Sequence, residues 1–335
     1  MTSRFLMSAS LALLLAACGG GDDGGSPPPT GGGGPTPSPS PSPSPSPSPS
    51  PTPTYQTFSQ LTGNQTFRTT CAGTNSTLSS GLITVGAAPF GAGVTIASNR
   101  DVPNYQITTD GGGLAGTFQQ SWTQADRDPA TTSSEAYRRV NANGFTEIFS
   151  TFSPLLGTGT YQYVRFGQIV TQINADRISL FCAYGVPTLL NDRPTTPVNL
   201  INNFTAGNLS VIENIGAGPR SDYAISSTRV TLTGNPSTGA ITVTIDLKGR
   251  LRTQSGTATE VTDLGVFTGQ VTIDGTTQSF DGRLRDSGNN PAGQFGGWFF
   301  GPQGREAAVS FNVVSRRNDS SDVLAGAIAF VAPQS

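Results

Sequence analysis

The sequence contains no histidine, and its only two methionines, Met1 and Met7, lie at the N-terminus. Without histidine there is no Ser-His-Asp triad and no Cys-His pair, and a zinc site loses its usual nitrogen ligand. Carboxylate pairs could still act as acid and base, but no spacing singles out two of them. A haem iron would need a free cysteine or a tyrosine, the candidates being Tyr137, Tyr161, Tyr163 and Tyr223. We therefore expect neither an enzyme nor a protein with a bound metal or cofactor.

An excess of charge of either sign is also missing. The chain has 19 Lys and Arg against 21 Asp and Glu, a net charge of −2. Nucleic-acid binding requires a basic surface, so we expect no nucleic-acid partner. Lys248 is the only lysine. Almost all cationic groups are therefore arginines, which favour planar, bidentate contacts with carboxylates.

The chain begins with the pattern of an exported protein. Arg4 precedes an apolar run, residues 5–17, that is shorter than the ~20 residues needed to span a bilayer, as in a secretory signal. The run ends in Leu-Ala-Ala-Cys, which resembles the bacterial lipobox and predicts a signal peptide at 1–17 and a lipidated Cys18. Gly19, by resemblance to known sorting rules, favours the outer membrane. The alternative is an ordinary signal peptide with a chance cysteine.

A tether follows the predicted lipidation site. Residues 19–54 are only Gly, Asp, Ser, Thr and Pro, and end in a Ser-Pro repeat, so this stretch cannot build a core and we expect disorder. Alternating prolines favour polyproline II. At ~3.1 Å per residue, residues 27–54 would form a semi-rigid spacer on the order of 80–90 Å long. A Pro-rich ligand for another domain is the alternative.

Lipidation of Cys18 would leave two cysteines, Cys71 and Cys182. An exported protein meets an oxidising compartment, which predicts a disulfide between them. The chain-entropy model gives a loop of about 110 residues a stabilisation of up to ~4–5 kcal/mol.

Two β-rich units are expected after the tether, because Gly, Thr, Ser and Asn are abundant and long helical patterns are absent. In the first unit, residues 55–187, we expect strands at 93–97, 116–121, 136–140, 144–149, 160–167 and 177–184. Asn143-Gly144 predicts a two-residue type I′ turn. Alternation places Tyr161, Tyr163 and Arg165 on one face of a half-buried strand, in preference to an aromatic binding platform.

Residues 186–207, rich in Pro, Thr and Asn, are interpreted as the connection to the second unit. There we expect strands at 208–213, 223–233, 240–252, 260–273, 277–285, 294–300, 306–314 and 323–331, with a tight turn at Asp274-Gly275. Eight short strands separated by turn residues predict a sandwich or a closed barrel.

Residues 297–311 read Gly-Trp-Phe-Phe-Gly-Pro-Gln-Gly-Arg-Glu-Ala-Ala-Val-Ser-Phe. This pattern resembles the C-terminal signature of transferrin-binding-protein-B-like surface lipoproteins, which is Gly-x-Phe-Tyr/Phe-Gly-Pro, a few residues, Glu, two small residues and an aromatic. Phe280-Asp281-Gly282 also fits, whereas Ala307-Ala308 stand where the family usually has glycines. The resemblance implies a β-rich handle-like domain, residues 55–187, then an eight-stranded antiparallel β-barrel, residues 188–335. Residues 184–188 resemble the handle-to-barrel joint of the family's solute-binding-like members.

The signature has a structural explanation that does not depend on function. Gly301 and Gly304 permit a positive φ in a tight turn, and Pro302 presets φ there. Glu306 can accept hydrogen bonds from turn amides, and we expect Trp298, Phe300 and Phe311 to fill the barrel. We therefore predict structural roles for the signature residues Gly297, Phe299, Phe300, Gly301, Pro302, Glu306 and Phe311.

Outward-facing cations could form a contact surface. Strand alternation puts them on the wet faces of 241–252 and 277–286, at Lys248, Arg250, Arg252, Arg283 and Arg285. If both strands belong to one barrel, the five could cluster and steer an acidic partner. The alternative is a solvated face balanced by Asp246, Asp281 and Asp286.

The leader, the tether and the resemblance together imply a lipid-anchored outer-membrane protein at the cell surface. Such a protein would capture a partner or solute, such as an iron-carrier protein or haem, and pass it to an outer-membrane transporter. This inference rests on analogy of fold. A structural or adhesive envelope lipoprotein without a small ligand is the alternative.

Overall fold

The computed structural model describes residues 54–77, 83–88, 90–110, 116–130, 135–153, 155–156, 159–174, 176–204, 211–215, 221–253, 256–316 and 323–333. The predicted signal peptide, Cys18 and all of the tether except Thr54 lie outside these residues. All of the described residues belong to one compact unit, Pro51–Ser335. The described elements are strands and three short 3-10 helices, η1 (Phe58–Gln60), η2 (Gln124–Asp126) and η3 (Pro302–Gly304). The predicted all-β class is therefore confirmed, and no described helix is long and apolar enough to cross a membrane.

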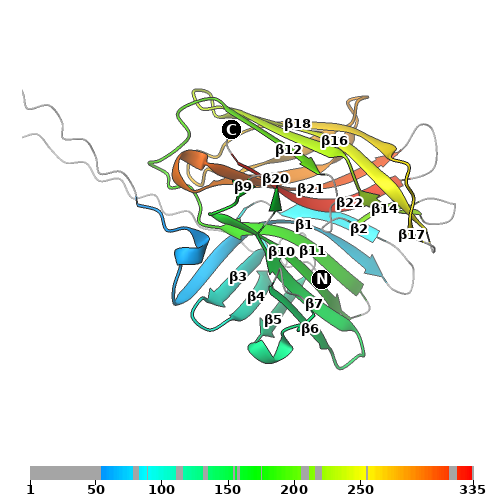
Figure 1. The fold of residues 1–335 in the computed structure, drawn as a ribbon. Coiled ribbons are helices and arrows are strands. Elements are labelled where there is room, and N and C mark those ends of the chain that lie inside the picture. The colour runs from blue at the N-terminus through cyan, green and yellow to red at the C-terminus, as the bar shows by residue number, and fades with distance from the viewer. Residues whose placement is uncertain are drawn as a thin grey trace, which may run out of the picture. The chain divides into compact units, whose positions relative to one another are not determined.

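The first sheet nearly closes on itself (Figure 1). Its hydrogen-bonded order is β5 (Thr117–Trp122), β4 (Asn104–Asp110), β3 (Val94–Asn99), β1 (Asn64–Thr77), β11 (Asp176–Gly185), β10 (Val164–Ile173), β7 (Thr146–Phe152) and β6 (Glu135–Val140), with β2 (Ile83–Ala88) beside β1. The edges meet where Arg127 bridges to Tyr137 and where Arg139 Nη1 donates to the Ser121 carbonyl at 2.8 Å. We call this sheet the first barrel. A separate small sheet pairs β8 (Leu155–Leu156) with β9 (Gly159–Thr160).

The second sheet closes completely, and we call it the second barrel. Its strands are β12 (Val198–Phe204), β13 (Val211–Ile215), β14 (Ser221–Ile225), β15 (Thr228–Asn235), β16 (Ala240–Thr253), β17 (Gly256–Thr257), β18 (Thr262–Thr272), β19 (Phe280–Arg285), β20 (Pro291–Phe300), β21 (Glu306–Arg316) and β22 (Val323–Pro333). The order β16, β14, β13, β22, β21, β20, β19, β18 returns to β16 through its pairing with β18. The predicted eight-stranded antiparallel barrel is confirmed, with β15 and β12 extending beside β16.

Several local predictions are wrong. Strand β12 lies in the segment 186–207 that we interpreted as a connection, and its Val198 and Leu200 are buried in the core. The strand expected at 160–167 begins only at Val164. Tyr161 and Tyr163 precede it and are 3% and 7% exposed, so they are core residues and not one face of a half-buried strand.

The two predicted turns differ in outcome. In Asn143-Gly144 only Gly144 has a positive φ, of 76°, whereas a type I′ turn needs positive φ at both central residues. Asn141 instead closes a longer loop by donating its N–H to the Phe145 carbonyl. At Asp274-Gly275 the tight turn is confirmed, because the Asp274 carboxylate accepts the N–H groups of Thr276 and Thr277.

Strands β1 and β11 form a wall between two hydrophobic cores, since side chains alternate across a strand. One face of the wall belongs to the core of the first barrel, with Cys71, Leu180, Cys182 and Tyr184. The other face belongs to a core shared with the second barrel, with Ala72, Phe181 and Ala183. Figure 1 shows β1, β2 and β11 beside β20, β21 and β22. The two barrels are therefore packed against each other by apolar burial.

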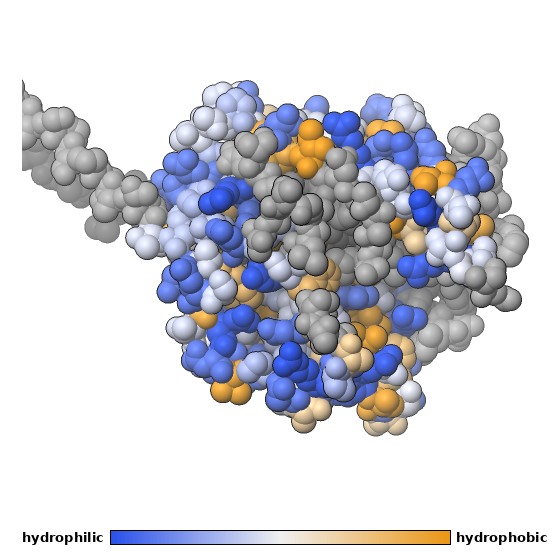
Figure 2. Space-filling view, viewed as in Figure 1, coloured by the Kyte–Doolittle hydropathy of each residue, from blue (hydrophilic) through white to orange (hydrophobic). Residues whose placement is uncertain are grey.

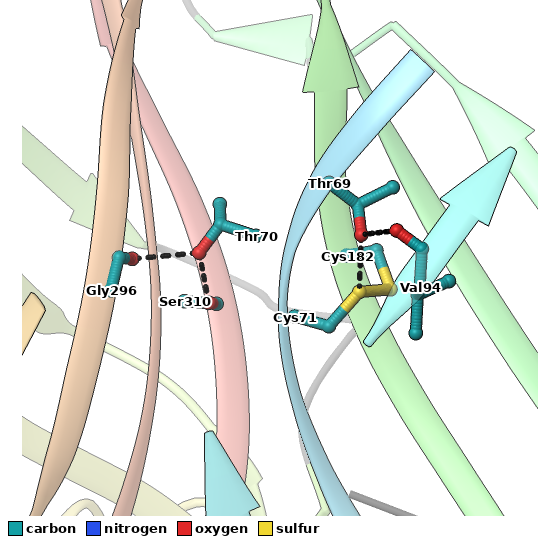
Figure 3. Close-up of a disulfide and its surroundings, with 7 residues drawn as sticks. All are labelled: Thr69, Thr70, Cys71, Val94, Cys182, Gly296 and Ser310. Atoms are coloured by element: carbon teal, nitrogen blue, oxygen red, sulfur yellow. Dashed lines mark hydrogen bonds between the residues drawn. A yellow bond between two sulfur atoms is a disulfide. The ribbon is translucent and has the colours of Figure 1, made fainter. Parts of the chain in front are cut away.

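The predicted disulfide is confirmed. Cys71 and Cys182 are direct cross-strand partners on β1 and β11, and both are fully buried. In Figure 3 the disulfide lies on one side of β1 while the neighbouring Thr70 points the other way, toward Gly296 and Ser310. The disulfide therefore links β1 to β11 on the face of the wall that belongs to the core of the first barrel.

Candidate functional site

The family-like signature lies where the two barrels meet. The side chains of strand β20 point alternately toward the two barrels. Phe299 packs against Phe280 inside the second barrel, at a ring-centroid separation of 5.6 Å. The rings of Trp298 and Phe300 contact the ring of Phe90 of the first barrel instead, at centroid separations of 3.9 and 6.1 Å. The expectation that Trp298 and Phe300 fill the barrel is therefore wrong, because their positions on the strand face the neighbouring sheet.

The rest of the signature lines the second barrel. Phe311 is the cross-strand partner of Phe295, and both are at most 1% exposed. A Cβ at Gly297 would lie 2.4 Å from the Phe280 ring, so this glycine makes room for a core aromatic.

The turn after β20 needs its glycine for two reasons. Gly301 has a φ of 72°, a conformation that side chains with a Cβ disfavour. A Cβ there would also lie 2.4 Å from the ring of Tyr163. Pro302 follows as the first residue of η3. The predicted turn is therefore present, and it brings the backbone of Gly301 into close contact with Tyr163.

Glu306 is the polar centre of this joint. Its Oε1 accepts the N–H of Gln162 at 2.6 Å, and its Oε2 accepts those of Tyr163 and Val164 at 2.9 and 3.0 Å. The residue is 3% exposed. Burial raises the pKa of its carboxyl above the ordinary value, although the three N–H donors and Arg165 act in the opposite direction. The carboxylate thus satisfies three amides in the bend before β10, since buried N–H groups must find acceptors.

The connection between the barrels pairs with the same turn. Gly301 N donates to the Val186 carbonyl, and Thr188 N donates to the Phe299 carbonyl, each at 3.0 Å. Pro187 bridges to Phe300, and Thr188 Oγ1 donates to the Gly301 carbonyl at 2.7 Å. The two segments that resemble the family, 184–188 and 297–311, are therefore direct neighbours.

Sequence reasoning missed a second polar contact in the joint. Thr70 Oγ1 of β1 donates to the Gly296 carbonyl at 2.9 Å and contacts Ser310 Oγ at 2.6 Å, all in a buried position (Figure 3). The only hint of this contact in the sequence was the pair Thr69-Thr70 beside Cys71. It does not identify the partner, because Ser310 is 240 residues away along the chain.

The five predicted surface cations do not form one cluster. Arg250, Arg252, Arg283 and Arg285 are exposed and Lys248 is half-buried, as expected for outward positions. Arg285 pairs with Thr268, which pairs with Thr244, six residues from Arg250 along β16. At about 3.3 Å per residue this separation is roughly 20 Å. The clustering prediction is therefore wrong, and Lys248 is paired with Asp246 at 3.0 Å.

The four tyrosines named as possible haem ligands all lie in the interior. Tyr137, Tyr161, Tyr163 and Tyr223 are at most 8% exposed, so none presents a free phenol to solvent. Within the described ranges no three His, Cys, Asp or Glu side chains come together to hold an ion. On the face in Figure 2, hydrophobic residues lie in small separate patches among hydrophilic ones.

Comparison with known proteins gives structural matches only. No protein-family model and no curated protein matches the sequence. A double mutant of transferrin-binding protein B from Haemophilus parasuis Hp5 matches with 15% identity and a TM-score of 0.38, over 79% of this chain and 45% of that one. The haemoglobin receptor HpuA from Kingella denitrificans matches with 15% identity and a TM-score of 0.31, over 82% and 87%.

Transferrin-binding protein B from serogroup B Neisseria meningitidis matches with 12% identity and a TM-score of 0.31, over 82% of this chain and 77% of that one. The present chain spans about half the length of the Haemophilus parasuis structures that it matches. Two of these three structures are of transferrin-binding protein B, after which the family that residues 297–311 resemble is named.

Proposed function

We propose that the protein is a surface lipoprotein of the outer membrane, anchored through Cys18, that captures an extracellular protein such as an iron carrier. The observation that carries the proposal is the position of the signature 297–311. The residues that resemble a family of capture lipoproteins form the joint between two barrels, centred on Glu306. The export signal and the long tether support the same role, because they would hold this rigid joint away from the membrane.

The packing of the second barrel favours a protein partner over a solute held inside. Its described interior is filled by fully buried aromatic rings, those of Phe267, Phe280, Phe295, Phe299 and Phe311. Small-molecule sites are concave and usually of about 300–1,000 Å³. A partner would therefore be met by the outer surface, and transfer to an outer-membrane transporter would follow from there.

The test uses intact cells that express the full chain. Fluorescently labelled transferrin and haemoglobin are titrated onto the cells, and a pull-down from growth medium uses the immobilised fragment of residues 55–335. We expect saturable binding of a defined protein, loss of that binding after protease treatment of intact cells, and release of the Cys18→Ser variant from the membrane.

Two results would count against capture. Binding only to cell-wall polymer or to the protein itself would favour a structural or adhesive lipoprotein. A Cys18→Ser variant that stays in the membrane fraction would contradict the anchor.

A further inference from the structure

A cleft opens at one end of the second barrel. It has a volume of about 270 Å³ and lies between the start of β12, the turn that joins β15 to β16, and the turn after β18. Its floor includes Val198, Ile241 and Phe299, which are 4%, 1% and 1% exposed. Because this volume is below that of a typical small-molecule site, the cleft suits one apolar side chain better than a whole ligand.

Apolar residues also lie exposed beside the cleft. Leu189 and Leu190 are 45% and 54% exposed, and they are the only two adjacent residues among the large exposed hydrophobic residues of the described chain. The Leu189 carbonyl accepts Gln278 Nε2 at 3.2 Å, and Gln278 lines the cleft and is 2% exposed. The Leu189 backbone is therefore tied to a buried residue of the cleft, and the exposed pair Leu189-Leu190 adds apolar surface beside it.

Arg193 places one fixed positive charge on the rim. Arg193 lines the cleft; its Nε donates to the Leu190 carbonyl at 3.2 Å and its Nη2 to the Gly275 carbonyl at 2.9 Å. In the part of the chain that the structure describes, no carboxylate pairs with Arg193. Two acidic residues adjoin the bonded segments and keep their negative charges, but their carboxylates are directed elsewhere, since Asp192 accepts Gln303 N and Asp274 accepts the amides of its own turn.

These features converge on one kind of partner. We propose that the cleft, with Leu189, Leu190 and Arg193, docks a segment of a partner protein that presents an apolar side chain beside a carboxylate. The apolar side chain enters the cleft and its neighbours cover the leucines, while the carboxylate meets a guanidinium that is already held in place. Such preorganisation lowers the entropy cost of binding. The docking site rests on the proposed capture function, for which it names the contact surface.

The experiment uses the full chain with Cys18→Ser and an array of acetylated hexapeptides. Each peptide carries a central Leu or Phe flanked by Asp, Asn or Lys. We expect peptides flanked by Asp to bind at least about tenfold more tightly than those flanked by Lys, which corresponds to ~1.4 kcal/mol. Arg193→Gln should abolish this difference while leaving the binding of Asn-flanked peptides unchanged, and Leu189→Ser with Leu190→Ser should weaken all peptides.

The matched control is Arg250→Gln, which removes an exposed arginine from the same barrel. Arg250 lies nine residues from Ile241 along β16, roughly 30 Å from the cleft, so its loss should leave peptide binding unchanged. All the substituted side chains are exposed, and equal melting temperatures would establish that the variants fold.

Equal binding of Asp- and Lys-flanked peptides, or no peptide binding by a folded protein, would overturn the docking site. Either result can coexist with saturable capture on intact cells. Failure of the docking site is therefore distinguishable from failure of the proposed function.

Discussion

Both barrels have hydrophobic cores, but the first barrel also buries a polar network. The second barrel buries aliphatic residues on β16, Ile241, Val243, Ile245 and Leu247, together with phenylalanines. The first barrel buries a polar network: Glu147 accepts Arg139 Nε at 2.8 Å, Gln120 Nε2 at 2.9 Å and Thr171 Oγ1 at 2.7 Å. It also holds a Tyr105–Glu135 hydrogen bond and the disulfide.

Two properties of a barrel therefore differ here: the closure of its hydrogen-bonded ring and the residues that fill its interior. The second barrel closes its hydrogen-bonded ring and can be filled by apolar residues alone. The first barrel leaves its edges to meet at β5 and β6, and polar side chains cross between them, as with Arg139 and the Ser121 carbonyl. An unpaired polar group is costly in a buried network, and Gln120 Oε1 of this network already lacks a partner, so the first barrel should be the more sensitive to loss of a single polar group.

The largest effect is expected at the contact that joins the barrels. Glu306→Ala removes the acceptor of three N–H groups, of which those of Tyr163 and Val164 are buried, and each unsatisfied buried donor costs about 1–3 kcal/mol. We expect a loss of roughly 2–6 kcal/mol in the free energy of unfolding, measured by denaturant titration. Glu260→Ala, at an exposed position, is the control and should stay within about 0.5 kcal/mol of wild type. Similar losses in both variants would refute the role given to Glu306.

Removal of the disulfide should come next. Cys71→Ala with Cys182→Ala frees a loop of 111 residues and should cost about 2–5 kcal/mol. Amide hydrogen exchange should show the loss first in β1 and β11, and less in β16 and β18. Uniform loss across both barrels would mean that the bond does not act mainly on the first barrel.

A smaller effect should distinguish the stability contribution of a buried carboxylate from that of a half-exposed one. Glu147→Ala leaves Thr171 Oγ1 and Arg139 Nε without this acceptor, while Gln120 Nε2 keeps Thr171 Oγ1, and should cost about 1–3 kcal/mol. Asp246→Ala breaks the Lys248 pair, whose two side chains are each 34% exposed, and should cost about 0–1 kcal/mol. Equal costs, measured by thermal unfolding, would contradict the larger contribution assigned to the buried network around Glu147.

The last effect is absent at neutral pH and is a pH dependence in the alkaline range. Burial raises the pKa of Tyr137 to about 12 from its ordinary value of 10.0, and burial likewise raises those of Tyr105 and Tyr184. The unfolded chain would ionise first, so this stabilisation is complete below pH 10 and is lost as the pH rises through 12 and above. Phenolate absorbance should rise together with loss of circular dichroism. Ionisation of all tyrosines near pH 10 with the fold intact would contradict this.

The sequence predicted the second barrel better than the first, for a physical reason. Alternation along 241–247 reports directly which side of a strand is buried, so β16 and its neighbours could be found. Strand β12, with Asn199, Asn202 and Asn203, contains residues that are rare in strands, and it was mistaken for a connection. In β1, Thr69 and Thr70 are both fully buried because they face two different cores, so no wet face exists to reveal the strand.

The joint could be predicted only in part. The signature indicated a tight turn and an acceptor at Glu306, because Gly, Pro and Glu have local preferences. Its partners could not be predicted, since Gln162 lies 144 residues away and reaches Glu306 only when both barrels are complete. The same applies to the separation of Arg250 from Arg285, which depends on the register between three strands.

Amide hydrogen exchange at Gln162, Tyr163 and Val164 tests most directly whether Glu306 locks the barrels into one unit. In the wild-type protein these three amides should exchange as slowly as the central amides of β11 and β20. In Glu306→Ala they should exchange at least about tenfold faster, while the central strands of the second barrel remain protected. Fast exchange of the three amides in the wild-type protein would contradict the account.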